Sequence, residues 1–67
     1  MNVHLSAQQY KILIGYANGQ TYEEIGRSLG ITKSGVNYHV RRIQRTLGAR
    51  NMANAVLKAC QIGLIKL

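Results

Sequence analysis

The sequence predicts an all-α fold of four helices, in which the second and third helices form a helix-turn-helix. Serine, threonine or asparagine stands where each helix is expected to begin, and a glycine follows each apolar stretch. Between these signals, apolar residues recur at helical spacing. The stretch from Thr21 to Arg45 has an acidic first half and a basic second half without acids, with Gly30 at the turn between them.

The length and the charge limit the kind of protein. Sixty-seven residues allow one domain, over 1–67. A formal net charge of +7, from 9 Lys and Arg against 2 Asp and Glu, favours a polyanionic partner, either nucleic acid or an anionic membrane surface. No apolar run approaches the ~18–20 residues that span a bilayer. The basic residues lie opposite an apolar stripe that the core needs, so we expect no binding to a membrane surface either. The single cysteine, Cys60, suits a reducing cytosol, so a cytoplasmic location is expected.

The first helix is expected over about 7–18. Ser6 and Gln9 have the spacing of a capping box, and Gly19 ends the helix. Four apolar residues at i, i+3, i+4 and i+7 are predicted to form its buried face: Tyr10, Leu13, Ile14 and Ala17.

The second helix is expected to follow Thr21 and to end near position 29. Thr21 and Glu24 have the spacing of a second capping box, and acids in a first turn suit the helix dipole. Gly26 interrupts this helix, where glycine costs about 1 kcal/mol. We therefore expect a neighbouring helix to approach closely at Gly26.

The third helix is expected over 32–47. Its inward stripe follows i, i+4, i+7 and i+11 and consists of Val36, Val40, Ile43 and Leu47. Its opposite face carries only polar and basic residues, namely Lys33, Ser34, Asn37, Tyr38, Arg41, Arg42 and Arg45. A short helix, a glycine turn and a basic helix are typical of proteins that place the second of the two helices in the DNA major groove.

The outer face of the third helix suggests two kinds of DNA contact. Asparagine can bond adenine and arginine can bond guanine, so Asn37, Tyr38 and Arg41 are predicted to contact bases. Phosphate contacts are predicted for a second set, namely Thr32, Lys33, Ser34, Arg42, Arg45 and Arg50. For Arg42, the alternative to a phosphate contact is exposure to solvent. For the three residues predicted to contact bases, the alternative is a polar face that is only solvated. Tyr22 is equally suited to reach the DNA backbone or to pack in the core.

The fourth helix, expected over 52–62, has apolar residues on two sides. Met52, Ala55, Val56 and Ala59 can face the core. A second apolar surface is then left by Ala53, Leu57, Cys60 and Leu64. We interpret this surface as a symmetric dimer contact. The alternative is that Leu64, Ile65 and Leu67 fold back and cover it.

Other reactive residues have simpler interpretations. His39 is expected to be half-buried against the second helix or the following loop. His4 and Cys60 offer no ligand spacing with it, so no metal site and no cofactor are predicted. Cys60 is interpreted as a small packed residue, with a redox role as the alternative. The sequence shows no serine-histidine-acid set and no phosphate loop, so we expect no enzyme.

A joint pattern of residues extends over Leu5–Leu64. Its members are Leu5, Ser6, Leu13, Ala17, Gly19, Glu24, Ile25, Leu29, Gly30, Ile31, Thr32, Val36, His39, Ile43, Leu47, Gly48, Asn51 and Ala55. Through this pattern the chain resembles the LuxR-type (GerE, NarL/FixJ) helix-turn-helix DNA-binding domain of bacterial transcription regulators. The chain departs from the family at several positions: Gln9 replaces a glutamate that supports the scaffold, and Gly35, Asn37 and Met52 replace threonine, lysine and arginine.

The resemblance implies a fold of four helices, in which the third reads DNA and the fourth pairs two subunits on an inverted-repeat site. It places Asn37, Tyr38 and Arg41 at the family's base-facing positions. We expect a sequence-specific regulator that stands alone without a sensor domain. The alternative is an interaction module that pairs through the fourth helix with a larger regulator and modulates it. Besides double-stranded DNA and a second copy, RNA polymerase or a larger regulator are the partners considered.

Overall fold

The computed structural model describes residues 3–66, which contain four helices and no strand. In order they are α1 (Ala7–Ala17), α2 (Tyr22–Leu29), α3 (Lys33–Leu47) and α4 (Met52–Gln61). The all-α helix-turn-helix fold predicted from the sequence is confirmed. The bounds differ by one residue at three ends, because Asn18 and Ile62 are C-caps and Thr32 is the N-cap of α3.

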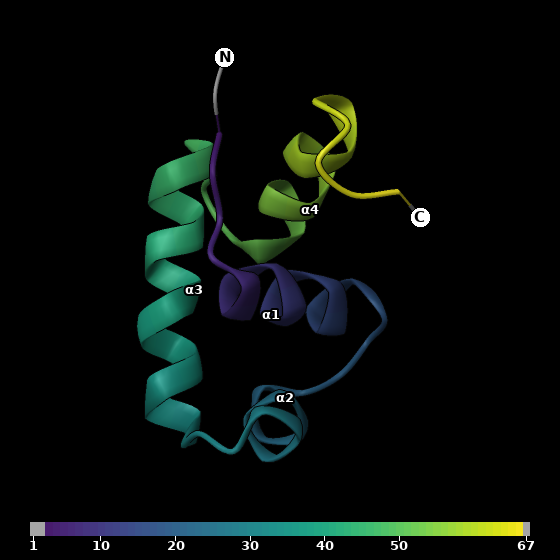
Figure 1. The fold of residues 1–67 in the computed structure, drawn as a ribbon. Helices are drawn as coiled ribbons and strands as arrows, with labels where there is room; N and C mark the ends of the chain where they lie inside the picture. Colours follow the sequence, from purple (N-terminus) through teal and green to yellow (C-terminus); the bar gives the residue numbers. More distant parts are fainter. Residues whose placement is uncertain (1–2, 67) are drawn as a thin grey trace.

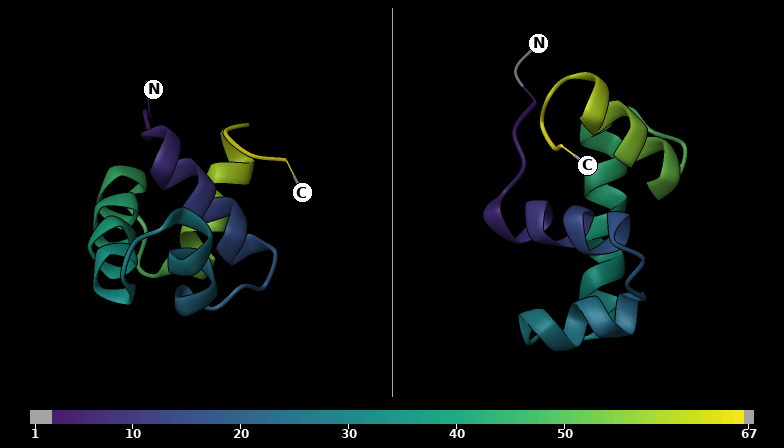
Figure 2. Two further views of the ribbon diagram at one scale, coloured as in Figure 1. Left: turned by 60° about the horizontal axis from the view of Figure 1, so that its bottom comes forward. Right: turned by 90° about the vertical axis from the view of Figure 1, so that its right-hand side faces the viewer.

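The longest helix, α3, is the element on which the other three pack (Figure 1). In Figure 1, α2 lies at the N-terminal end of α3, α4 lies toward its C-terminal end, and α1 crosses between them. The right-hand view of Figure 2 shows the same order. Helices α2 and α4 do not contact each other, whereas α1 contacts all three of the others.

Each helix begins at the capping residue that the sequence indicates. The side chains of Ser6, Thr21, Thr32 and Asn51 all accept a hydrogen bond from the backbone N–H three residues later. Both predicted capping boxes form, at α1 and at α2. At the turns that follow α2 and α3, Gly30 and Gly48 have φ values of 71° and 64°, a region that favours glycine.

The core is built from eleven buried apolar residues contributed by every helix and by the segment after α4. They are Ile12, Leu13, Ile25, Val36, Val40, Ile43, Leu47, Met52, Ala55, Ala59 and Ile65. The whole predicted stripe of α3 is among them. On α4, Met52, Ala55 and Ala59 are buried as predicted, and Val56 packs against the cluster at half exposure.

The buried face predicted for α1 is wrong in part. Tyr10 is 40% exposed, whereas Ile12, which the prediction left out, is fully buried. Ile14 and Ala17 are half-buried, and Leu13 alone of the four is buried. Helix α1 packs on α3 and crosses between α2 and α4 (Figure 1), so neighbours cover it on more than one side. Its buried surface is therefore wider than one amphipathic stripe, with Ile12 and Leu13 fully buried.

Gly26 is buried at a close approach, but the prediction that a neighbouring helix makes this approach is only partly correct. A Cβ atom at Gly26 would lie 2.7 Å from the carbonyl oxygen of Ile31 and 3.3 Å from Cγ2 of Val36. The nearest neighbour is therefore the backbone of the α2–α3 turn, with α3 itself slightly farther away. This contact brings α2 close to the start of α3.

Candidate nucleic-acid interface

The face of α3 opposite the core consists of exposed polar and basic side chains. Val36, Val40, Ile43 and Leu47 point into the core, so the residues between them face solvent. All seven residues predicted on this face are exposed, namely Lys33, Ser34, Asn37, Tyr38, Arg41, Arg42 and Arg45. No acidic residue occurs in α3, so this face attracts anions along its length.

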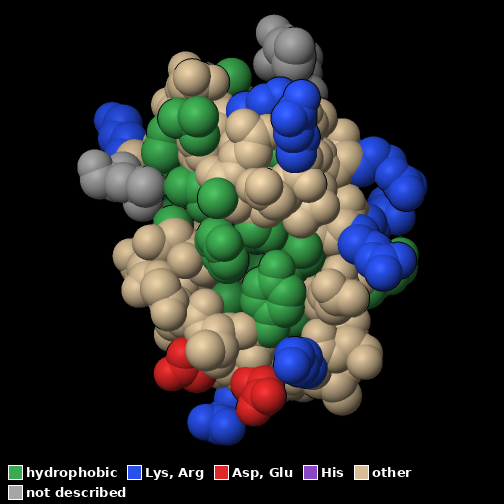
Figure 3. All heavy atoms as spheres, turned by 180° about the vertical axis from the view of Figure 1, so that it is seen from behind, with side chains coloured by type: hydrophobic (Ala, Val, Ile, Leu, Met, Phe, Trp, Pro, Cys, Tyr) green, Lys and Arg blue, Asp and Glu red, His purple; other side chains and the backbone are tan. Residues whose placement is uncertain are grey.

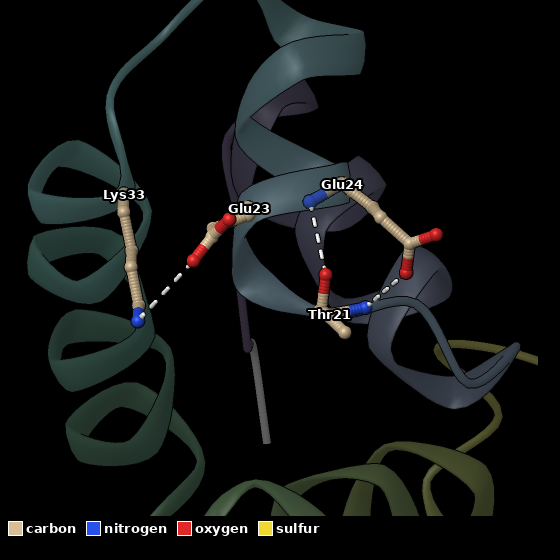
Figure 4. Close-up of polar contacts among 4 residues, drawn as sticks. All are labelled: Thr21, Glu23, Glu24 and Lys33. Carbon is tan, nitrogen blue, oxygen red and sulfur yellow. Dashed lines mark hydrogen bonds and ion pairs between the residues drawn. The ribbon is translucent and has the colours of Figure 1, made fainter.

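At the N-terminal end of this face, Thr32 caps α3 and Lys33 forms an ion pair with α2. Thr32 is exposed, and its Oγ1 accepts the backbone N–H of Gly35 at 3.0 Å, which leaves the hydroxyl proton free to donate. Lys33 Nζ lies 3.8 Å from Glu23 Oε1 (Figure 4). Both side chains of this pair are 66% exposed, so the pair is weak in water. From the sequence, an acid in the first turn of this helix was expected only to suit the helix dipole, and the contact of Glu23 with Lys33 was not predicted.

A small open cleft lies where α2 and α3 meet, and Tyr22, Lys33, Ser34 and Asn37 line it. Tyr22 is half-buried against the core cluster, and its ring lies 6.3 Å from that of Tyr16. Burial, together with the neighbouring Tyr16, raises the pKa of the Tyr22 hydroxyl above its usual value. Tyr22 thus packs in the core and also lines the cleft between α2 and α3, with a hydroxyl that stays protonated at neutral pH.

In the middle of the face, Tyr38 and Arg42 contact each other. Tyr38 is 59% exposed, although it is a large aromatic residue. The Arg42 guanidinium carbon lies 5.8 Å from the centre of the Tyr38 ring, and Arg42 Nη1 lies 3.5 Å from the Tyr38 hydroxyl. The Arg42 side chain therefore lies along that of Tyr38. The sequence-based prediction for Arg42 was a phosphate contact or exposure to solvent, and neither included this arrangement.

His39, next to this pair, is half-buried as predicted, but its hydrogen-bonding neighbour belongs to α1. Its Nδ1 lies 3.5 Å from Gln9 Nε2, whereas the prediction placed it against the second helix or the loop. Gln9 also accepts the backbone N–H of Ser6 at 3.2 Å. The glutamine at the position of the family's glutamate thus completes the cap of α1 and joins that cap to α3.

Arg50 is exposed in the turn between α3 and α4. Its backbone N–H donates to Asn54 Oδ1 at 3.2 Å, which fixes the turn. The 15 residues of α3 span roughly 22 Å, so Arg50 and Lys33 lie at opposite ends of the basic face. These two residues are too far apart to bind the same phosphate group.

The outer side of α4 is apolar and only partly covered. Of the four predicted residues, Ala53 and Leu57 are exposed, and Cys60 and Leu64 are half-buried. The alternative prediction is correct for Ile65, which folds back to 2% exposure, while Leu67 lies outside the described residues. Leu57 remains 54% exposed, and Ile62, which the sequence analysis missed, is 51% exposed.

The two acids of the chain lie together in the first turn of α2. On the face seen in Figure 3 the acids lie near the lower end with lysine and arginine side chains beside them, and hydrophobic side chains gather toward the centre. Within residues 3–66 no three His, Cys, Asp or Glu side chains gather as a metal site would require. No described helix is long and apolar enough to cross a membrane.

The chain matches one protein family over most of its length. The family described as "Bacterial regulatory proteins, luxR family" matches residues 3–59. Transcriptional activator protein PhzR of Pseudomonas fluorescens is 42% identical over 64 residues, which cover 96% of this chain and 26% of that protein. Transcriptional activator protein SolR of Ralstonia nicotianae is 41% identical over 61 residues, covering 91% of this chain and 26% of that protein.

One of the similar proteins is named a repressor. Transcriptional repressor ThaA of Burkholderia thailandensis is 34% identical over 61 residues, again 91% of this chain and 26% of that protein. This chain therefore spans about a quarter of the length of these relatives. The family match, the helix-turn-helix and the basic face of α3 agree with one another. The chain belongs to the LuxR family of bacterial regulatory proteins, and its helix-turn-helix is of the type that binds DNA in transcription regulation.

Proposed function

We propose that the protein is a sequence-specific regulator that binds double-stranded DNA in the bacterial cytoplasm as a homodimer on an inverted-repeat site. The observation that carries the proposal is the outer face of α3, where seven exposed polar and basic side chains stand without an acid. A helix of this kind suits the major groove, which is wide enough to admit it.

The proposed base contacts come from Asn37, Tyr38 and Arg41, which are all exposed on this face. An asparagine can bond N6 and N7 of adenine, and an arginine can bond O6 and N7 of guanine. Tyrosine offers its ring to a thymine methyl group and its hydroxyl to a phosphate. Because threonine and lysine of the family are replaced by Gly35 and Asn37, the preferred DNA sequence is expected to be particular to this chain.

The proposed phosphate contacts lie at the two ends of the same face. At the start of α3, Thr32, Lys33 and Ser34 are exposed beside the open cleft, where hydroxyl groups and an ammonium group suit phosphate oxygens. At the other end, Arg45 and Arg50 are exposed around the α3–α4 turn. Contacts at both ends would set the position of α3 along the groove.

The proposed dimer contact is the outer surface of α4 formed by Ala53, Leu57, Cys60 and Leu64. Its support is the exposure of Leu57 and the neighbouring Ile62, each more than half exposed in the single chain. Burying such apolar groups against a second copy is favourable. The same exposed residues would also serve the second candidate function, in which α4 pairs with a larger regulator.

The experiment that tests the proposal is selection of duplexes from a random pool by the purified chain, followed by affinity measurements on the enriched site. Arg41→Ala is expected to weaken binding to that site by roughly 1–3 kcal/mol. Lys66→Ala removes an equal charge from the exposed segment after α4 and is the matched control. A folded Arg41→Ala protein that binds unchanged would remove the Arg41 assignment. Failure of the folded wild-type chain to enrich any duplex would instead favour the interaction module.

A further inference from the structure

We propose that Tyr38 and Arg42 form one recognition unit, in which the tyrosine positions the guanidinium of Arg42 to read a guanine. This inference rests on the proposed DNA-binding function and goes beyond it, because the family resemblance places Tyr38 but not Arg42 among the base-facing residues. It also changes the role of Arg42, which was predicted to contact phosphate.

The geometry of the pair places the charge of Arg42 next to the base-facing residues. Tyr38 and Arg42 are four residues apart, so they are neighbours on one side of α3. Long side chains on a helix lean toward its N-terminus, so Arg42 covers the turn that Tyr38 occupies. Arg42 Nη1 lies 3.5 Å from the Tyr38 hydroxyl, and the guanidinium carbon lies 5.8 Å from the ring centre.

The acids of the chain do not compete with Tyr38 for Arg42. Glu23 lies beside Lys33, and Glu24 accepts the backbone N–H of Thr21 at 2.8 Å. Within residues 3–66 the Tyr38 side chain is accordingly the partner found for the Arg42 guanidinium. The pair is exposed, and such contacts are weak in water. Exclusion of water at a DNA surface strengthens them, so the arrangement becomes firmer when DNA is bound.

The contact leaves the donors that guanine recognition needs. Arginine has five N–H donors in a planar fork, and only the Nη1 group points to the Tyr38 hydroxyl. The Nη2 and Nε groups remain available to bond O6 and N7 of a guanine in the major groove. Tyr38 acts here as a positioning residue, since it restricts the directions in which Arg42 can present these donors.

The test measures the affinity of four proteins for the duplex that the wild-type chain selects and for duplexes with each base pair changed singly. The proteins are wild type, Tyr38→Phe, Arg42→Lys and the double variant Tyr38→Phe/Arg42→Lys. Both substitutions are at exposed positions, and Phe keeps the ring while Lys keeps the charge. Arg45→Ala, which removes a proposed phosphate contact, is the control.

We expect Arg42→Lys to lose roughly 5- to 150-fold of discrimination at one guanine pair. Tyr38→Phe should lose part of the discrimination at the same pair, and the double variant should lose no more than Arg42→Lys alone. Arg45→Ala should weaken binding to all duplexes alike. The inference would be overturned if Tyr38→Phe and Arg42→Lys lost discrimination at different base pairs. It would also be overturned if either variant weakened binding equally on every duplex. Neither result would contradict the proposed DNA-binding function. A wild-type chain that prefers no duplex would overturn the proposed function as well.

Discussion

Lys58 of α4 donates a hydrogen bond from Nζ to the backbone carbonyl oxygen of Gly48 at 2.8 Å. Gly48 is the C-cap of α3, where the last carbonyl groups lack partners within the helix and carry its partial negative charge. The ammonium of one helix therefore binds the end of another. This bond joins the helix that we propose to read DNA to the helix that we propose to form the dimer.

Replacement of Lys58 by methionine should show the value of this bond. Methionine keeps much of the apolar stem but removes the donor, so we expect the free energy of unfolding to fall by about 1 kcal/mol. Urea unfolding followed by circular dichroism measures the change. Lys11→Met, at an exposed position on α1, is the control and should have little effect. Equal stability of the two variants would show that the Lys58 bond contributes nothing.

Two glycines in helices provide a matched pair of substitutions with opposite expected signs. Gly26→Ala should destabilise the fold by roughly 1–3 kcal/mol, because the new Cβ meets the Ile31 carbonyl oxygen at 2.7 Å. Gly35→Ala should stabilise it by up to about 1 kcal/mol, since its Cβ meets no atom closer than 3.5 Å and alanine favours a helix. Chemical unfolding of both variants tests this. Similar changes of the same sign would contradict the close approach at Gly26.

The capping box of α2 should make stability depend on pH. The backbone N–H of Thr21, the Thr21 hydroxyl and the charge of Arg27 hold the pKa of Glu24 below its usual value. A lowered carboxyl pKa stabilises the fold at pH values above the pKa of the unfolded chain. This effect is lost as the pH falls through the lower pKa of the folded protein. The melting temperature of wild type should therefore exceed that of Glu24→Gln at pH 7, and the difference should shrink in acid. Gln9 of α1 is the natural uncharged equivalent of this variant. A difference that stays constant from pH 7 to acid would count against the charge of Glu24.

Glu23 is expected to restrain DNA binding through Lys33. Its carboxylate lies 3.8 Å from Lys33 Nζ and would also repel a nearby phosphate. Glu23→Gln should therefore increase DNA affinity and steepen its salt dependence by up to about one unit of slope. Glu24→Gln is the matched control, because Glu24 bonds to Thr21 (Figure 4). Equal gains in affinity from both variants would point to net charge alone, without a role for the Lys33 contact.

The exposed Leu57 allows a direct test of the proposed dimer contact. Because Leu57 is 54% exposed in the single chain, Leu57→Glu should fold and yield monomers where the wild type forms dimers. Sedimentation velocity over a concentration series measures this. Tyr10→Glu changes an exposed residue on α1 and should leave the association unchanged. If Leu57→Glu sedimented like the wild type, the dimer contact would have to lie elsewhere.

The parts of the fold that could be predicted from the sequence are those that depend on neighbouring residues. Ser6, Thr21 and Asn51 marked helix starts because a capping side chain bonds to the backbone only three residues away. The stripe of α3 was correct because one side of this helix faces the core. The buried face predicted for α1 was partly wrong, since helical spacing does not show that α1 would cross between α2 and α4 while it packs on α3 (Figure 1).

The candidate site, too, could be predicted from the sequence only in part. The exposed face of α3 followed from its period, whereas the contacts that fasten α3 to the rest of the fold join distant positions. Gln9 and His39 are thirty residues apart, and Lys58 reaches Gly48 from another helix. The Tyr38–Arg42 contact has the i, i+4 spacing of a helical pair, so it could have been found from the sequence. The absence of a sensor domain stays a prediction, because the chain spans only about a quarter of the length of the relatives that it matches.

The most direct test of DNA binding is fluorescence anisotropy of the purified chain with a random duplex pool over a series of salt concentrations. Lys33, Arg45 and Arg50 are the three charged residues that remain assigned to phosphates, so we expect the logarithm of affinity to fall with the logarithm of salt at a slope of about −3 per protomer. A folded chain that does not bind at low salt, or binds with no salt dependence, would contradict the proposal that the basic face of α3 contacts DNA.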